Sequence, residues 1–424
     1  MNVPNVALAA PPPSSLLRRL GPGLITGAAD DDPSGIATYS QVGAQFGYGL
    51  AWTMLFSLPF MIVIQEISGR IGCVTGHGIS ENLRRHYSPW LVRGVVVLLL
   101  VANVINLGAD LGAMGAALRL LLGGSARLYT VAFGVVCVGA EIFISYAVYA
   151  GVLKWLTLSL FAYVAVVFAV HVPWGEALSA TLLPHLALDS ASATALVAVL
   201  GTTISPYLFF WQAALEVEDQ HRHGASPLSI TPQDAQPQFA RIRFDTVAGM
   251  AVSNLIAICI IYATAATLHA TGVTDIQTSS QAAEALRPVA GKLTFVIFAA
   301  GIIGTGLLAV PVLAGSGAYA LSEAFQWREG LDRRLLQAKS FYATIAFSTM
   351  VGVCLNFTTL DPVKALYWSA VVNGVLAAPV MAVIMLIASN GRIMGRLTLP
   401  RSMQIFGWIA TVIMLAASIG FFVL

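Results

Sequence analysis

Apolar stretches of membrane-spanning length recur along the whole chain and are separated by short polar breaks. A transmembrane helix needs about 20 mostly apolar residues to cross about 30 Å of hydrocarbon. This criterion predicts eleven spans, with approximate centres at Asp32, Phe60, Asn106, Cys137, Ala162, Pro206, Ile256, Gly306, Phe347, Val375 and Met414. The pattern predicts an all-α membrane protein of about 11 transmembrane helices, whose two ends lie on opposite sides of the bilayer.

The first and the sixth spans are each interrupted near the middle. In the first span, the acidic run 30–32 is followed by Pro33, Ser34 and Gly35, and in the sixth span Ser205 precedes Pro206. Proline removes a backbone donor and disfavours helix in the residue before it, so both helices should break at mid-membrane. Two broken helices five spans apart predict an inverted repeat, with two halves related by a pseudo-two-fold axis in the membrane plane.

The predicted spans divide the chain into four segments. Residues 1–15, which include three consecutive prolines, are expected to be a disordered cytoplasmic tail. Residues 16–172 hold spans one to five, residues 190–390 hold spans six to ten, and residues 402–424 form a peripheral eleventh helix.

Composition supports a membrane setting and excludes some partners. Hydrophobic residues make up 57% of the chain, charged residues 10%, and the mean hydropathy is +0.80. These values describe a chain surrounded by the lipid bilayer and exclude a water-soluble domain. A formal net charge of +2, without a basic tract interleaved with aromatic residues, gives no indication of nucleic-acid binding.

The positions of the basic residues predict the orientation. If the N-terminus is inside, 17 of the 22 Lys and Arg residues fall on the inner side. The other five lie outside or near that face: Arg119, Arg127, Arg287, Lys292 and Lys364. Short cytoplasmic loops carry an excess of Lys and Arg. The protein is therefore predicted to lie in the cytoplasmic membrane with its N-terminus in the cytoplasm and its C-terminus on the outer side.

Asp32 lies at the first helix break and is the main candidate for a functional residue there. A carboxylate at membrane depth is costly, and unwound backbone there is tolerated only where it faces protein or a polar cavity. The alternative is a carboxylate at a helix end in the headgroup region, but the apolar segment continues on both sides of the break. Asp32 and the freed carbonyls are therefore expected to bind a cation, while the roles of Asp30 and Asp31 stay open.

Five short motifs, taken in order, resemble the Nramp family of divalent metal transporters. They are the ranges 21–23, 32–35, 65–87, 109–112 and 201–207. The resemblance implies the LeuT-type inverted repeat (5+5) with one peripheral helix, and secondary transport of a divalent cation by alternating access. The metal ion would be the cargo, and no cofactor is expected.

The resemblance also implies a ligand set. It places the metal at Asp32, with backbone carbonyls near Ala29 and Thr202 and the hydroxyl of Ser205. Gly35 stands where the family has a metal-binding Asn, and Ser205 where most members have a Met whose thioether contacts the metal. Exchanging sulfur for a hard hydroxyl oxygen should remove a preference for soft ions, and the loss of two larger side chains should widen the site.

Other departures concern the ion pathway. Tyr207 and Gln212 stand at positions where the family usually has histidines, and Ala113 where an acid is common. These changes resemble the divergent branch of Nramp-related magnesium transporters. They predict import of Mg²⁺ and/or Mn²⁺, with Fe²⁺ a third candidate, and weak or absent proton coupling. The residues considered for the pathway are Asp30, Asp31, Tyr207, Gln212, Asp110 and Asn373.

Several polar side chains in apolar surroundings have a more ordinary interpretation as interhelical hydrogen-bond partners. They are Glu66, Glu141, Asn103, Asn106, Asn254 and Asn373. Asn373 is the best site candidate among them, because the tenth helix borders the metal site in the resembled family.

Three other classes of function remain as alternatives of different weight. The soluble loops are short, and the chain has no phosphate loop, HExxH or dinucleotide fingerprint, so an enzyme is not expected. A polyamine or amino-acid permease on the same fold is the main rival, although an acidic cluster would repel the carboxylate of an amino acid. The paired breaks argue against a passive channel or a receptor.

Overall fold

The computed structural model describes residues 27, 29–144, 157–331, 333–358 and 361–424, and within these ranges it contains helices and no strand. The larger helices are α2 (Pro33–Phe46), α3 (Trp52–Thr75), α5 (Pro89–Leu122), α6 (Ala126–Phe143), α8 (Phe161–Ala169), α10 (Ser190–Thr203), α11 (Pro206–Arg222), α12 (Ala235–Thr267), α15 (Thr294–Phe325), α16 (Lys339–Leu355), α17 (Pro362–Ala388) and α19 (Arg401–Val423). The connecting helices are α4 (Ile79–His86), α9 (Trp174–Leu182), α13 (Ser279–Glu284), α14 (Arg287–Ala290) and α18 (Gly391–Met394).

Each of the eleven predicted spans corresponds to helix in the described residues. Eight helical stretches there are long and apolar enough to cross a membrane, with α10 and α11 together forming one of them. The stretch Leu158–Ala169 and α16 are shorter apolar helices, and α2 belongs to the first span. The predicted tail, residues 1–15, lies outside the described residues.

Both predicted helix breaks are present. Residue 30 is still helical, Asp31 and Asp32 are not, and α2 begins at Pro33. In the sixth span α10 ends at Thr203, and α11 begins at Pro206 after two non-helical residues. Proline is favoured at the first position of a helix, where its missing N–H would have no intrahelical partner, so in both spans it begins the second half-helix.

Helix contacts repeat between the two halves of the chain. Helix α2 packs on α12, and α11 packs in the same way on α3. Both contacts include a close backbone approach at a glycine. A Cβ added at Gly43 would lie 2.4 Å from the Ile261 carbonyl oxygen, and one added at Gly72 would lie 2.3 Å from the Ala213 carbonyl oxygen. Span one thus packs on span seven, and span six packs on span two. These are equivalent contacts when spans one to five and six to ten form an inverted repeat.

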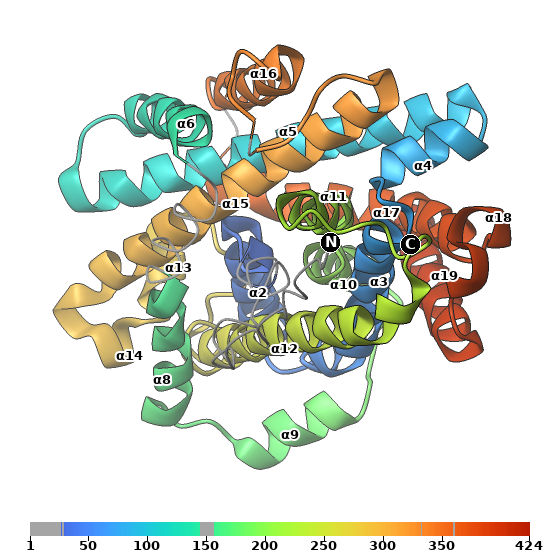
Figure 1. Ribbon diagram of the computed structural model, residues 1–424. Coiled ribbons are helices and arrows are strands. Elements are labelled where there is room, and N and C mark those ends of the chain that lie inside the picture. The colour runs from blue at the N-terminus through green and yellow to red at the C-terminus, as the bar shows by residue number, and fades with distance from the viewer. Residues whose placement is uncertain (1–26, 28, 145–156, 332, 359–360) are drawn as a thin grey trace, which may run out of the picture.

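The two broken helices lie in the interior of the bundle. Figure 1 shows α2 and α10 near the centre, with α5 and α15 crossing on one side and α12 on the other. Helices α5 and α15 pack along each other, and α19 lies at the edge against α17 and α10. The halves of the bundle therefore enclose the breaks, which is where a transporter of this architecture binds its substrate.

Candidate cation site at the two helix breaks

Asp32 caps the half-helix that follows the first break. Its Oδ1 accepts hydrogen bonds from the Gly35 backbone N–H at 2.8 Å and from the Ser34 hydroxyl at 2.6 Å. The side chain is 2% exposed, so the carboxylate is held by the start of α2 without contact with bulk water. An N-cap carboxylate is stabilised by free N–H groups at the helix start, and this local arrangement fixes its position.

The second oxygen of Asp32 faces a polar network on α5 and α17. The Asn106 amide donates to Asp32 Oδ2 at 3.0 Å and is 3.3 Å from Asp110 Oδ2. Asn373 donates in turn to the Asn106 side-chain oxygen at 3.2 Å. The structure therefore brings the predicted residues Asp32, Asp110 and Asn373 together. Asn106 joins them, although its sequence context favoured an ordinary interhelical role.

Tyr207 links the first break to the second. Its hydroxyl donates to the Ala29 carbonyl oxygen at 3.1 Å and lies 3.4 Å from Asp32 Oδ2. Tyr207 is in the first turn of α11, so its side chain reaches across from one broken helix to the other. The Ala29 carbonyl expected among the metal ligands is thus beside Asp32 and bound to a hydroxyl.

The freed carbonyls of the sixth span are bound to Ser205. The Ser205 hydroxyl is 3.0 Å from the Gly201 carbonyl oxygen and 2.8 Å from that of Thr202. The Thr202 hydroxyl, by contrast, is buried without a hydrogen-bond partner. At the second break, two carbonyl oxygens therefore accept a hydrogen bond from Ser205, whereas the Thr202 hydroxyl has no hydrogen-bond partner among the described residues.

Gly35 lies opposite Thr202, but the space around it is filled. An added Cβ would meet the Thr202 methyl at 3.3 Å, and the Asp30 carbonyl oxygen and the Tyr39 ring at 3.4 Å each. The expectation that glycine here widens the site is therefore wrong for this conformation. The neighbouring segments have closed around the missing side chain, because buried space in a packed interior is filled by its neighbours.

Asp30 and Asp31 face a different helix from Asp32. Asp30 Oδ2 and Asp31 Oδ1 lie 2.9 Å and 3.0 Å from the Ser253 hydroxyl of α12. No ion pair joins the three aspartates to a Lys or Arg within the described part of the chain. The first break therefore has two acidic sides, one toward α5 and one toward α12.

Gln212 belongs to a separate network. It donates to Glu216 at 3.0 Å and accepts a longer contact, 3.4 Å, from Gln65. Glu216 also pairs with Arg241 and accepts from the Cys73 thiol. This network runs along α11 toward α12, and among the described residues no hydrogen bond joins Gln212 to Asp32. Glu216 and Arg241 are not among the residues predicted from the sequence.

The other polar candidates mostly stabilise helix packing. Asn103 donates to the Leu313 carbonyl and to Ser316 on α15, and Glu66 pairs with Arg70 one turn away on α3. Glu141 is buried in α6, and neither of its carboxylate oxygens has a hydrogen-bond partner among the described residues. The interhelical interpretation is thus confirmed for Asn103, and also for Asn106 and Asn373, whose hydrogen bonds join α5 to Asp32 and α17 to α5.

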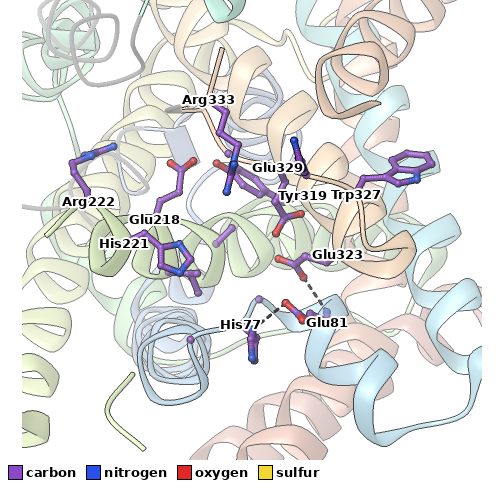
Figure 2. A pocket seen from close by; sticks show the side chains of 16 residues that line it. His77, Glu81, Glu218, His221, Arg222, Tyr319, Glu323, Trp327, Glu329 and Arg333 are labelled. Atoms are coloured by element: carbon purple, nitrogen blue, oxygen red, sulfur yellow. Dashed lines mark hydrogen bonds and ion pairs between the residues drawn. The ribbon is translucent and has the colours of Figure 1, made fainter. Parts of the chain in front are cut away.

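Two polar cavities lie at the ends of the bundle, and Asp32 lines neither. One, of about 520 Å³, has four glutamates on four segments around it, namely Glu81, Glu218, Glu323 and Glu329 (Figure 2). Arg222, Arg328 and Arg333 also line it. The other, of about 840 Å³, is lined by Arg119 and Arg127. Basic residues predicted for opposite faces thus line different cavities.

Two glutamates of the first cavity, both outside the spans, have opposite electrostatic surroundings. Burial alone would raise the pKa of Glu81, but hydrogen bonds from His77 and Arg85 lower it to about 2. Burial raises the pKa of Glu329 to about 10, with further repulsion from Glu323, Glu81 and Glu218 and opposition from Arg333. Glu81 is therefore a permanent charge, while Glu329 holds a proton at neutral pH.

The oxygen atoms near Asp32 come mostly from neutral groups. Within the described residues no group of three or more His, Cys, Asp or Glu is arranged to hold one metal ion. Apart from the Asp110 carboxylate beside Asn106, the oxygens near Asp32 are carbonyls, hydroxyls and amides, which are hard ligands that suit Mg²⁺, Ca²⁺ and Mn²⁺.

Comparison with sequence families identifies relatives over almost the whole chain. The family described as natural resistance-associated macrophage protein-like (Nramp) matches residues 23–424. A relative named divalent metal cation transporter MntH, from Klebsiella pneumoniae (strain 342), is 26% identical over 415 residues, which cover 94% of this chain and 92% of the relative.

Solved structures show the same fold at low sequence identity. The Eremococcus coleocola manganese transporter, in complex with an aromatic bis-isothiourea substituted compound, has a TM-score of 0.77 at 16% identity and covers 97% of this chain and 88% of its own. MhsT in complex with L-phenylalanine has a TM-score of 0.61 at 13% identity, covering 96% of this chain and 99% of its own. Mhp1, a nucleobase-cation-symport-1 family transporter, has a TM-score of 0.57 at 13% identity, covering 94% and 92%. The predicted LeuT-type fold is thereby confirmed.

Proposed function

The chain belongs to the Nramp family, and from that premise we propose that it imports Mg²⁺ and/or Mn²⁺, with Fe²⁺ a third candidate, through the cytoplasmic membrane by alternating access. Divalent metal transport is the function of its MntH relatives. We further propose that Asp32 is the fixed charge of the site, and that transport does not require proton coupling.

The observation that carries this proposal is the surroundings of Asp32. The carboxylate is buried, sits between two broken helices and is bonded only to neutral donors in the described residues. An isolated charge in hydrocarbon is costly unless an opposite charge offsets it. A divalent cation does so, and its lost hydration is replaced by the oxygens of Asp32, Ala29 and Thr202.

Selectivity is proposed to follow from the absence of sulfur at the break. Ser205 and Gly35 leave oxygen as the ligand type there, and oxygen ligands favour hard ions over Cd²⁺. Because the cleft around Gly35 is closed by Thr202 and Tyr39, partial hydration of Mg²⁺ would need the site to open. Mg²⁺ gives up water reluctantly, so we propose that it enters in an open conformation and is carried with some of its water.

A polyamine permease is the second candidate, and one observation favours it. Three buried aspartates without an ion pair to a described base suit an organic cation as well as a metal. The described cavities, however, do not reach Asp32. The metal interpretation therefore requires less rearrangement of the site, because a metal ion is much smaller than a polyamine.

The orientation is part of the proposal. The N-terminus is assigned to the cytoplasm from the distribution of Lys and Arg, and the separation of the basic residues into two end cavities supports the alternation of the spans. On this assignment, the cavity with four glutamates opens toward the cytoplasm and receives the released ion.

The test uses purified protein reconstituted in liposomes. Uptake of Mg²⁺, Mn²⁺, Fe²⁺ and Cd²⁺ is measured against labelled spermidine, with an internal pH reporter in the same vesicles. We expect uptake of Mg²⁺ and Mn²⁺, weaker uptake of Cd²⁺ and none of spermidine. Spermidine uptake without metal uptake would reject the metal proposal and support the permease.

A further inference from the structure

The two aspartates on the α12 side of the break form an arrangement that the divalent site does not use. Asp30 is 1% exposed and Asp31 is 4% exposed. One carboxylate oxygen of each lies at hydrogen-bond distance from the same hydroxyl, that of Ser253. Asp32 instead contacts α5 and α11, so this side of the break is a separate site.

One hydroxyl cannot serve both carboxylates. Ser253 has a single O–H to donate, yet the contacts to Asp30 and Asp31 measure 2.9 Å and 3.0 Å. The hydroxyl can donate to only one of the two carboxylates, so the other contact needs a proton or another cation between the oxygens. A positive ion bound to all three oxygens removes this conflict.

Two further polar groups are buried there without partners. The second oxygen of Asp30, Oδ1, accepts no hydrogen bond. The Tyr39 side chain is 1% exposed, and its hydroxyl has no hydrogen-bond partner among the described residues. Unpaired buried polar atoms are rare and costly, so these oxygens favour a cation that would contact them.

Charge balance favours a further cation at this break. With Asp110, which shares Asn106 with Asp32, the buried carboxylates Asp30, Asp31 and Asp32 can carry four negative charges, and no ion pair with a described base offsets them. A divalent cation on Asp32 leaves two of these charges over. A monovalent cation on the α12 side offsets one of them, and unpaired charge in a membrane interior is costly.

We propose that Asp30, Asp31 and Ser253 bind a monovalent alkali cation, Na⁺, alongside the divalent ion on Asp32. All the ligands are hard oxygens, and their close spacing suits a small ion. Coupling ions bind at the unwound segments of broken helices in transporters of this architecture. Binding of Na⁺ does not depend on the proposed function, but its effect on divalent transport rests on it.

The first experiment measures binding of radioactive Na⁺ to the purified full-length protein. We expect saturable binding that Asp30→Asn and Ser253→Ala each weaken by about tenfold or more, about 1.4 kcal/mol. Asp32→Asn should still bind Na⁺, which separates the two sites. Ser57→Ala is the matched control, because Ser57 is a buried serine whose hydroxyl contacts only its own helix, at the Met54 carbonyl.

The second experiment measures the consequence for transport at a clamped membrane potential. Replacing external Na⁺ by choline should slow Mn²⁺ uptake several-fold in the wild type, and should matter much less for Asp30→Asn. Absence of saturable Na⁺ binding by the wild type, or equal binding by Asp30→Asn, Ser253→Ala and wild type, would overturn the inference. Mn²⁺ uptake indifferent to Na⁺ would overturn the coupling while leaving the divalent function intact.

These outcomes separate the inference from the proposed function. Saturable Na⁺ binding together with spermidine uptake, and without metal uptake, would reject divalent transport and keep the Na⁺ site. Divalent uptake by a protein that binds no Na⁺ would support divalent transport and reject the Na⁺ site. Monodisperse elution of each variant establishes that a loss of binding is not a loss of folding.

Discussion

Asp32 combines a structural and a chemical role in one side chain. One oxygen caps α2, and the other faces Asn106 and Tyr207. The capping bond orients the carboxylate before any ion arrives. A site oriented in advance loses less conformational entropy on binding, so substitutions at Asp32 should affect both the ion and the local helix.

Replacing Asp32 by Asn should reduce divalent uptake by about 10-fold to 100-fold, because the amide keeps an oxygen but loses the charge, a difference of about 1.5 to 3 kcal/mol. Asp32→Ala should abolish uptake. The measurement is initial Mn²⁺ and Mg²⁺ uptake in liposomes. Asp275→Asn, at an exposed loop position, is the control, and near-normal flux in a folded Asp32→Ala protein would contradict the assignment.

Ser205→Met should raise the uptake of Cd²⁺ relative to Mg²⁺ by about tenfold, since a thioether favours soft ions. The substitution also removes the hydroxyl that bonds to the Gly201 and Thr202 carbonyls. Ser205→Ala removes the same hydroxyl without adding sulfur and is therefore the control. Unchanged relative rates across a metal panel for Ser205→Met would place the sixth break away from the ion.

At the scale of elements, small residues determine how closely the broken helices can approach their neighbours. Helix α10 lies against α17 at Gly201 and Gly374, where backbone meets backbone. Membrane helices associate through such close packing, because the surrounding lipid gives no hydrophobic driving force between them. The position of the second break therefore depends on glycines that carry no chemistry.

Gly201→Ala should destabilise the protein by about 1 to 3 kcal/mol, the usual cost of overpacking. The added Cβ would lie 2.1 Å from the Ala370 carbonyl oxygen and 2.3 Å from the Gly374 nitrogen, and backbone atoms must move to admit it. Thermal unfolding in detergent measures the effect. Gly139→Ala on α6, where the Cβ meets nothing within 4 Å, should not destabilise, and equal loss in both variants would refute the packing explanation.

The loop between α15 and α16 closes one side of the glutamate-lined cavity. The Leu331 N–H contacts both the Glu218 carboxylate and, at 3.2 Å, the Tyr319 hydroxyl, while Tyr342 donates to the Arg333 carbonyl at 2.8 Å. These bonds fasten the loop to α11, α15 and α16, and Glu329 lies within it.

Release of ions into this cavity should become faster as the pH on that side rises. Glu329 has a pKa of about 10 in the closed cavity, and hydration on opening should return it toward its ordinary value of 4.5. Glu329 therefore binds a proton more tightly when the cavity is closed than when it is open. The stability of the closed cavity is greatest at low pH, and between pH 4.5 and pH 10 it falls by up to about 1.4 kcal/mol per pH unit.

Uptake rates at several internal pH values test this dependence. The uptake rate of the Glu329→Gln variant should be the same at every internal pH, because an amide does not titrate. Glu284→Gln, which changes a partly exposed glutamate outside the cavity, is the control. A wild-type rate that is flat with internal pH would contradict the role given to Glu329.

At the scale of the whole molecule, the inverted repeat places one broken helix from each half at a shared centre. The halves pack through α5 and α15 and enclose both breaks (Figure 1). Asp32 lines neither of the two end cavities. The proposed alternating access requires a path to open from the breaks toward each face in turn.

Divalent uptake should proceed without matching internal acidification. The family's histidine positions hold Tyr207 and Gln212. The Tyr207 hydroxyl lies 3.4 Å from Asp32, the proposed ligand, and Gln212 bonds to Glu216. Mn²⁺ uptake and internal pH are followed together in liposomes at a clamped potential. Robust metal-dependent proton influx would contradict this expectation and would transfer the proton-carrying role to the buried aspartates.

The number of spans, the two helix breaks and the position of Asp32 at the first break could all be predicted from the amino-acid sequence. These features depend on local properties, namely runs of about 20 apolar residues and the effect of proline on the residue before it. The interhelical role predicted for Asn103 was likewise confirmed, because polar groups between membrane helices seek a partner.

Which polar side chains meet at the breaks depends on tertiary packing. Asn106 reaches Asp32 because α5 packs beside α2, and its spacing of four from Asp110 puts both on one face of α5. The space at Gly35 depends on how α10 packs against α2, and the contacts of Asp30 and Asp31 with Ser253 depend on α12. The Gln212 amide donates to Glu216 on its own helix. Contacts between distant segments follow from packing and hydrogen-bond satisfaction across helices, which local sequence does not specify.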